Sequence, residues 1–327
     1  MIGSNVQVKP AMRQVALIYN PVSGQYSARR AAAVADIMAV LSEAGITAKS
    51  FETGGPGSAM KLAEEAVEAG FDSVLACGGD GTVHEVLQAL VGTDASLGVV
   101  PLGTANALAA DLGLVGTPAK VARKLLDAAP ARVSVGRIHY QDQSGDSASR
   151  YFVVAAGVGA DALLMSRLDP RLKRRLGYVL YVIEACRLWL TWSFPLFEAV
   201  LPASGTGNQR VVRVSQLLAV RVRSFGGVLR KLAPGASLRN GSLSLLAFKT
   251  QSRLRYMMFL LAVLAGRHTF KREVELLDTP SIECRARDGS REDLFVEADG
   301  EVLGSLPVRL EVVPHSLSLL IPPGAQP

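Results

Sequence analysis

A glycine-rich turn with a single carboxylate, Cys77-Gly78-Gly79-Asp80-Gly81-Thr82, stands out among the residues that could carry chemistry. The flanking apolar and amphipathic runs predict a strand before it and a helix after it. Glycines let backbone N–H groups approach a phosphate closely, and a helix N-terminus adds positive potential. Asp80 would repel a bare phosphate, so it indicates a divalent cation between the two anions or a base for an attacking hydroxyl. The turn therefore predicts a nucleotide, a metal and phosphoryl transfer.

Two more glycine-bearing loops, Asn20–Gly24 and Gly103–Asn106, follow predicted strands in the first 130 residues. The predicted strands are Val15–Tyr19, Thr47–Phe51, Ser73–Ala76 and Leu97–Val100, and the predicted helices are Ala31–Leu41, Ser58–Ala69, a helix after Thr82, and Ala119–Ala128. This alternation predicts a parallel sheet with helices on both faces. Because ligands bind at the carboxyl ends of such strands, we expect all three loops to form one site.

Residues 131–327 have a different pattern, which predicts a β-rich sandwich or barrel with two helices inserted, Arg174–Trp192 and Leu254–Gly266. The predicted strands are Ser134–Tyr140, Arg150–Ala156, Phe194–Leu201, Val211–Arg223, Ser242–Phe248, Val274–Leu277, Ser281–Arg285, Leu294–Ala298, Leu310–Pro314 and His315–Ile321. The last of these could rejoin the first domain. We therefore expect two domains, 1–130 and 131–327.

Composition narrows the classes of function. The chain of 327 residues is 49% hydrophobic and carries a net charge of +6, which fits an anionic substrate, a nucleotide or an anionic membrane surface. No basic run is interleaved with aromatic residues, so nucleic acid is not an expected partner. Three scattered cysteines indicate a reducing compartment, and four scattered histidines argue against a zinc site. With no secretory leader and no clean apolar span, we expect a cytoplasmic protein that binds membranes peripherally.

Several motifs also have purely structural interpretations. Thr82 and Glu85 have the spacing of a capping box, and Asp299-Gly300-Glu301 is a strong two-residue hairpin signal. The cluster Arg171–Arg175 is either a solvated face or a contact for an anion or lipid headgroup. The helix at Arg174–Trp192 either packs in the core or lines an acyl-chain pocket.

Taken together, six motifs resemble the diacylglycerol kinase catalytic-domain family, which includes soluble bacterial diacylglycerol kinases, YegS-like kinases, and sphingosine and ceramide kinases. They occur in family order from Val15 to Pro323: Asn20-Pro21-Val22-Ser23-Gly24, Gly78-Gly79-Asp80-Gly81-Thr82-Val83-His84-Glu85-Val86, Pro101-Leu102-Gly103-Thr104-Ala105-Asn106, Gly157-Val158-Gly159-Ala160-Asp161-Ala162, Ala233-Pro234-Gly235-Ala236 and Asp299-Gly300-Glu301. One such motif alone would be weak evidence, but six in order are specific.

The resemblance implies an α/β N-terminal domain with a parallel sheet, like that of NAD kinase and diacylglycerol kinase, and a β-sandwich-like C-terminal domain. It implies an ATP-dependent lipid kinase with Mg²⁺ at Asp80 and a general base at Glu301, although in sphingosine-type members the position of Asp80 has been assigned as the base. Asp161 would contact the lipid headgroup. The implied nucleotide-binding residues are Asn20, Ser23, Gly24, Thr53, Gly78, Gly79, Gly81, Thr82, Glu85, Gly103, Thr104 and Asn106.

Two positions depart from the pattern of the bacterial diacylglycerol kinases, which carry aspartate where this chain has Ala107 and Asn240. Those aspartates belong to one metal-and-water network, so a structural Mg²⁺ is in doubt here. The resemblance therefore does not decide whether the lipid that accepts the phosphoryl group is a diacylglycerol or a sphingoid lipid. An NAD kinase-like enzyme and a non-catalytic lipid- or nucleotide-binding protein are the alternatives, and a homodimer is possible.

Overall fold

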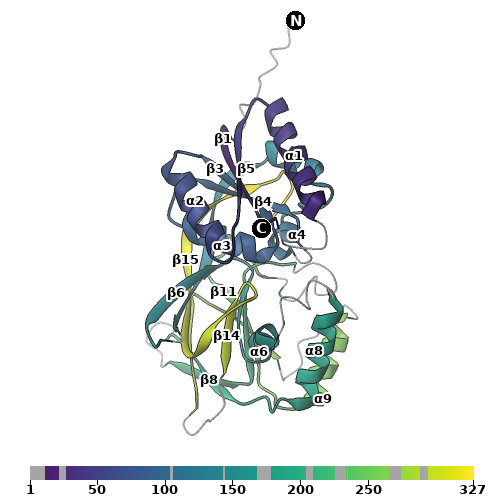
Figure 1. Cartoon of the computed structure of the whole chain (residues 1–327). Coiled ribbons are helices and arrows are strands. Elements are labelled where there is room, and N and C mark those ends of the chain that lie inside the picture. Colours follow the sequence, from purple (N-terminus) through teal and green to yellow (C-terminus); the bar gives the residue numbers. More distant parts are fainter. Residues whose placement is uncertain are drawn as a thin grey trace, which may run out of the picture.

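The computed structural model describes residues 12–21, 27–103, 106–142, 144–167, 178–203, 209–224, 233, 235–264, 274–287 and 294–327. The N-terminal half alternates strands and helices around a parallel sheet (Figure 1). Its elements are β1 (Gln14–Tyr19), α1 (Ser27–Glu43), β2 (Thr47–Glu52), α2 (Ser58–Glu68), β3 (Ser73–Gly78), α3 (Asp80–Leu90), β4 (Ser96–Pro101), α4 (Ala107–Asp111) and α5 (Pro118–Leu126). The strands run in the order β2-β1-β3-β4.

Apolar burial explains why these segments form a layered domain. Strand β3 is buried along its whole length, as expected for a central parallel strand covered on both faces. Helices α1 and α5 pack against each other, and α2 and α3 pack against each other on the other side of the sheet (Figure 1). The ends of β1, β3 and β4 from which their loops leave face the second half of the chain, where α3 contacts β6.

Two long antiparallel strands join the halves: β5 (Ala129–Gln141) and β15 (Glu301–Ile321) pair along most of their length. The end of β15 also pairs in parallel with β4, through Ser318 opposite Ser96. The stretches predicted as Leu310–Pro314 and His315–Ile321 thus form one strand, with a register shift near His315 where φ is 48°. The C-terminus accordingly lies beside the N-terminal half (Figure 1).

The C-terminal half is β-rich, and its strands cover a second hydrophobic core. Its remaining strands are β6 (Ser147–Phe152), β7 (Ala155–Val158), β8 (Phe197–Leu201), β9 (Arg210–Val214), β10 (Gln216–Val220), β11 (Leu243–Phe248), β12 (Val274–Thr279), β13 (Ser281–Arg285) and β14 (Phe295–Ala298). One series runs β12-β11-β10-β7-β14-β15, and β13 pairs with a later part of β15, with Ile282 opposite Leu310, and continues through β8 to β9. The predicted α/β and β-rich halves are confirmed.

Two predicted strands are wrong because polar contacts with residues far away in the sequence divide each of them. The predicted strand Val211–Arg223 is split at Ser215, so β9 pairs with β8 while β10 pairs with β7 and β11. Ser215 is fully buried, and its hydroxyl lies 2.7 Å from the Tyr256 hydroxyl. The predicted strand Arg150–Ala156 is likewise divided into β6 and β7, at Val153 and Val154.

The described residues of the C-terminal half form three helices: α6 (Ala160–Arg167), which was not predicted, α8 (Tyr178–Thr191) and α9 (Arg253–Leu264). Helices α8 and α9 agree with the predicted helices, although the basic cluster Arg171–Arg175 lies outside the described residues. The two helices lie side by side at the outer edge of this half (Figure 1). Among the described residues, no helix has the length and apolarity needed to cross a bilayer.

Candidate active site

Helix α3 begins inside the glycine-rich turn, with Gly79 as its N-cap and Asp80 as its first residue. A Cβ placed on Gly78 would lie only 2.3 Å from Thr82 Oγ1, so glycine is required there by contact with the first helical turn. Gly81 is exposed, and no side chain caps the helix N-terminus. The first backbone N–H groups of α3 thus face an open surface, which is the arrangement that binds phosphate.

The predicted capping box is wrong, because α3 starts two residues before Thr82. Glu85 instead reaches across to α2, where its two carboxylate oxygens accept hydrogen bonds from the N–H groups of Gly57 and Ala59, both at 2.9 Å. A carboxylate at that position satisfies the unpaired N–H groups of a helix start and complements its dipole. Glu85 therefore ties two helices together, and its assignment to the nucleotide stays a prediction.

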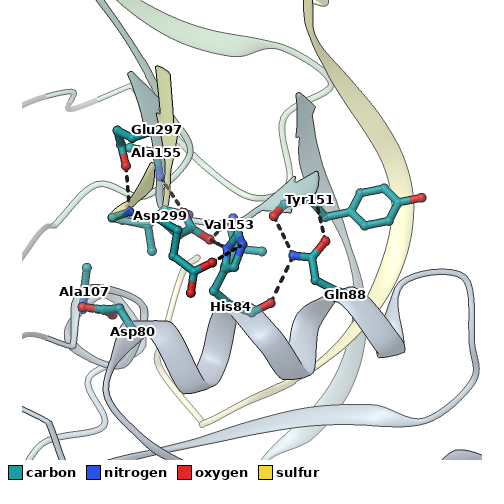
Figure 2. Close-up of polar contacts among 12 residues, drawn as sticks. Asp80, His84, Gln88, Ala107, Tyr151, Val153, Ala155, Glu297 and Asp299 are labelled. Atoms are coloured by element: carbon teal, nitrogen blue, oxygen red, sulfur yellow. Dashed lines mark hydrogen bonds and ion pairs between the residues drawn. The ribbon is translucent and has the colours of Figure 1, made fainter. Parts of the chain in front are cut away.

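Asp80 has a structural partner that the sequence does not reveal. Its carboxylate accepts a hydrogen bond from the N–H of Ala107 at 2.9 Å, so it caps the short helix α4 from another loop (Figure 2). The N–H of Leu102 also donates to the Gly78 carbonyl at 2.8 Å. These bonds bring the loops after β3 and β4 together at the sheet edge, as the strand order predicts.

The other predicted nucleotide residues lie around the same edge. Arg30, on α1, is 6% exposed, and it donates to the carbonyls of Asn20 at 2.6 Å and Leu102 at 3.0 Å. Thr53 is buried after β2, with its N–H bonded to the Tyr19 carbonyl. The Asn106 amide donates to the carbonyl of Gly103 at 2.9 Å. The predicted residues Ser23, Gly24 and Thr104 lie outside the described residues.

The predicted hairpin is confirmed and delivers an acidic pair to this edge. Ala298 pairs with Glu301 across a two-residue turn in which φ is 48° at Asp299 and 87° at Gly300. Asp-Gly suits a turn with two positive φ values. The Asp299 carboxylate accepts three backbone N–H groups, from Val153, Val154 and Ala155, at 2.8–3.0 Å (Figure 2). These bonds explain why β6 and β7 are separate strands.

His84 lies between the hairpin carboxylates and is only 1% exposed. Its Nδ1 is 3.4 Å from Asp299 Oδ2, and its Nε2 is 3.6 Å from Glu301 Oε2. Burial lowers the pKa of His84, but the bond to Asp299 and the charges of Asp299 and Glu301 outweigh it and raise the pKa overall. Sequence reasoning missed His84. Its position one helical turn after Asp80, on the same face of α3, was the available signal.

Glu301 lies over the start of α3. A Cβ placed on Gly81 would be 3.7 Å from Glu301 Oε1, and the Glu301 side chain is 42% exposed. Burial raises the pKa of Glu301 above its ordinary value, while the nearby His84 charge lowers it. The structure therefore brings Glu301 to the glycine-rich turn, from the far half of the chain. Gln88, on the next turn of α3, fixes this junction by pairing with the backbone of Tyr151 (Figure 2).

Asp161 lies in the first turn of α6, separate from these contacts. Its Oδ2 occupies the space of a Gly157 side chain, since a Cβ built there would be 1.7 Å away. Both of its carboxylate oxygens are buried and contact no other side chain's polar atom at hydrogen-bonding distance among the described residues. Burial raises its pKa to about 6, although the nearby N–H groups of Ala162 and Asp161 act to lower it. Glu297 sits opposite Gly157 on β14, and burial and then the charge of Asp161 raise its pKa well above the ordinary value. This pair of buried acids could receive a polar or cationic group.

The two departures from the bacterial diacylglycerol kinase pattern are visible at Ala107 and Asn240. The Ala107 N–H is used by Asp80, and the Asn240 amide donates to the carbonyl of Gly235 at 3.1 Å. The described residues contain no cluster of three His, Cys, Asp or Glu side chains that could hold a metal. A structural Mg²⁺ of the kind held by paired aspartates therefore does not fit here. A Mg²⁺ held by Asp80 together with phosphate oxygens does fit, because Mg²⁺ often takes one carboxylate plus substrate phosphates.

Comparison with known proteins identifies the chain. Residues 14–138 match the diacylglycerol kinase catalytic domain, and residues 152–321 match the YegS C-terminal NAD kinase beta sandwich-like domain. A diacylglycerol kinase of Mycobacterium tuberculosis is 31% identical over 318 residues, covering 94% of this chain and 95% of its own. A Chromohalobacter salexigens protein named "Probable lipid kinase YegS-like" is 32% identical over 273 residues, covering 82% of each chain.

A solved protein structure has the same fold. A diacylglycerol kinase structure from Bacillus anthracis superimposes with a TM-score of 0.68 at 18% identity, covering 96% of this chain and 98% of its own, and shows the same fold. These matches span both halves and confirm the family predicted from the six motifs. The chain belongs to the diacylglycerol kinase catalytic-domain family and is a lipid kinase.

Proposed function

We propose that the protein transfers the γ-phosphoryl group of ATP to a hydroxyl of a membrane lipid of the diacylglycerol or sphingoid type. The observation that carries the proposal is the position of Glu301, whose Oε1 lies 3.7 Å from a Cβ built on Gly81 in the first turn of α3. An acid from one half of the chain and an uncapped helix start from the other thus face the same space. Phosphoryl transfer needs a base for the hydroxyl and donors for the phosphates in that relation.

In this proposal Glu301 accepts the proton of the lipid hydroxyl. The lipid oxygen forms the new bond to the γ-phosphorus, and the bond to the departing ADP oxygen breaks. The N–H groups of Gly81 and Thr82, at the start of α3, stabilise the phosphate charge. Asn20, Ser23, Gly24, Thr53, Gly78, Gly79, Glu85, Gly103, Thr104 and Asn106 are the other proposed nucleotide contacts. When bound, a Mg²⁺ at Asp80 would neutralise phosphate charge.

We assign the base to Glu301 in preference to Asp80 on geometric grounds. Asp80 uses a carboxylate oxygen to hold the Ala107 N–H, so it organises the loop after β4. The Glu301 side chain is 42% exposed and can reach a substrate. Its environment also raises its pKa through burial, which makes it a better proton acceptor than an ordinary glutamate.

His84 sets the charge state of that base. It is held by Asp299, which is itself fixed by three backbone N–H groups, and its Nε2 faces Glu301. A positive His84 favours the ionised, active form of Glu301. The other charged groups that act on Glu301 are Arg150, which favours the same ionised form, and Glu85 and Asp299, which oppose it.

Replacing His84 with glutamine should therefore move the acidic limb of the pH–kcat/KM profile to higher pH. Without the histidine charge the pKa of Glu301 rises further, so the base becomes protonated earlier as pH falls. Activity should recover at alkaline pH, where Glu301 is ionised in both proteins. The measurement is kcat and KM for ATP across pH. The control is His139→Gln, the same change at a histidine on β5 that contacts Glu311. A uniform loss at every pH would contradict this role.

The acceptor is proposed to lie toward Asp161, whose buried carboxylate has no side-chain hydrogen-bonding partner among the described residues. A hydroxyl would hydrogen-bond to Asp161 or Glu297, and the ammonium of a sphingoid base would form an ion pair with them. Both groups are recognised by carboxylates, so the same pocket chemistry serves the two lipid types. Asp161→Asn should weaken a sphingoid acceptor more than a diacylglycerol, since only the former carries a cation.

Supplying the protein with γ-labelled ATP and Mg²⁺, and with either a mixed lipid extract or NAD, tests the proposal. We expect label in a phosphorylated lipid, whose identification then gives the acceptor class. Label found only in NADP would show an NAD kinase instead. If ATP binds but no label is transferred to either acceptor, the chain is a binding protein. The Glu301 hairpin and the Asp161 segment favour the first outcome.

A further inference from the structure

The outer surface of α8 and α9 concentrates exposed apolar side chains. Of the nine large hydrophobic side chains that are exposed in the described part of the chain, five lie on these two helices. They are Ile183 and Leu190 on α8, and Leu254, Met258 and Leu261 on α9. Leu190 is 60% exposed and Leu254 is 67% exposed, whereas monomeric proteins seldom gather such side chains in one place.

Helical spacing places these side chains on one stripe of each helix. Ile183 and Leu190 are seven residues apart, and Leu254, Met258 and Leu261 follow the spacing i, i+4, i+7. The opposite faces are used for packing. Leu188 is 5% exposed, and Tyr256 is stacked on Phe248 in an aromatic cluster that covers the sheet. Core packing therefore accounts for the inner stripes and leaves the outer ones without a partner within the described residues.

The two helices form one surface. The Trp189 indole donates to the Arg253 carbonyl at 2.9 Å, and the Arg253 guanidinium donates to the Trp192 carbonyl at 3.1 Å. These bonds hold the start of α9 against the end of α8, so the stripes lie together at the outer edge seen in Figure 1. We call the five apolar side chains and their flanking arginines the α8–α9 face.

The positive charge of the α8–α9 face indicates which kind of partner it binds. The helices carry three arginines, Arg187, Arg253 and Arg255, against a single glutamate, Glu184. Glu184 is largely covered, with a side chain 15% exposed, and it lies 3.9 Å from Arg187, whose side chain is 70% exposed. An apolar stripe rimmed by cations suits an anionic lipid surface. A symmetric contact with a second copy would bring the arginines of both copies together, which is unfavourable.

We propose that the α8–α9 face docks on a bilayer containing anionic phospholipid, with its apolar stripes in the acyl boundary and its arginines among the phosphates. This deepens the proposed function, on which it rests for the need to reach a lipid acceptor. Helix α8 packs on α6, and α6 carries Asp161 in its first turn. Docking on this face would therefore place the membrane beside the proposed acceptor position.

Vesicle binding without ATP tests this proposal independently of catalysis. The double variant Leu190→Gln/Leu254→Gln removes one apolar side chain from each stripe. A matched control is Val115→Gln/Leu276→Gln, which changes two exposed apolar side chains outside this face. We expect wild type and control to sediment with phosphatidylcholine–phosphatidylglycerol vesicles. The face variant should bind at least about tenfold more weakly, because it loses apolar burial in the membrane. Binding of wild type to phosphatidylcholine alone should be weaker and less sensitive to salt.

Activity assays separate this proposal from the proposed function. The face variant should lose activity on lipid embedded in vesicles and keep it on a short-chain acceptor dispersed in water. Equal vesicle binding by the face variant and the control would overturn the docking proposal. So would a wild-type dimer that the face variant converts to a monomer in light scattering, with no vesicle binding, since a second copy would then cover the face. Vesicle binding with no phosphorylation of any lipid would contradict the proposed function alone.

Discussion

Replacing Glu301 with glutamine is expected to lower kcat by about 100- to 10,000-fold while ATP binding is largely retained. Glutamine keeps the size of the side chain but cannot accept the hydroxyl proton. The nucleotide contacts proposed at the start of α3 come from backbone N–H groups and do not depend on this carboxylate. Steady-state kinetics with the identified lipid, together with calorimetric titration of ATP, would measure the two effects separately.

A matched control is Glu283→Gln, which makes the same change at an exposed glutamate on β13. Its kcat should stay within a factor of about two of wild type, as expected for a surface substitution. Unchanged turnover in Glu301→Gln would show that the base is elsewhere. If Asp80→Asn then abolished the chemical step with ATP binding intact, the base would be Asp80, as assigned in sphingosine-type members.

Local patterns were sufficient to predict most elements of the N-terminal half, although not the short helix α4. Strand and helix periodicities are properties of short segments, so β1 to β4 and the helices between them follow from the sequence. The Asp299-Gly300 turn is equally local, because only these two residues must accept positive φ. The three loops at one sheet edge follow in turn from the order of parallel strands.

Contacts between residues far apart in the sequence could not be predicted in the same way. Glu85 matched a local capping box, yet it satisfies helix α2, because two N–H groups there need an acceptor. Asp299 is separated from Val153 by 146 positions, and its bonds divide a segment that looks like one continuous strand. The only sequence signal for His84 was its position one helical turn after Asp80, since its role depends on both hairpin carboxylates being brought to α3.

Long-range polar contacts of this kind have a functional consequence in this fold. The proposed base and the proposed phosphate site come from different halves, so their separation depends on how the halves are joined. Gln88 and Asp299 provide that junction, through the backbone of Tyr151 and of the segment between β6 and β7. The catalytic geometry is therefore supported by residues that need not touch a substrate.

Replacing Asp299 with asparagine is expected to lower the free energy of unfolding by about 2–3 kcal/mol. Three backbone N–H groups would lose their carboxylate acceptor, and a hydrogen bond to a charged group is worth roughly 1.5–3 kcal/mol. Asparagine tolerates the same positive φ, so the turn itself should not be strained. Urea unfolding should show a lower midpoint with an unchanged slope. The control is Asp278→Asn, at an exposed aspartate that accepts one hydrogen bond, from Ser244.

The same variant should lower kcat at a temperature where it remains folded. Asp299 positions both Glu301, two residues along the hairpin, and His84, through Nδ1. A loosened hairpin would let the carboxylate of Glu301 move away from the first turn of α3, and small displacements of a catalytic group are costly. A variant with wild-type stability and turnover would show that the three N–H groups find other acceptors and that the hairpin is held by its strand pairing alone.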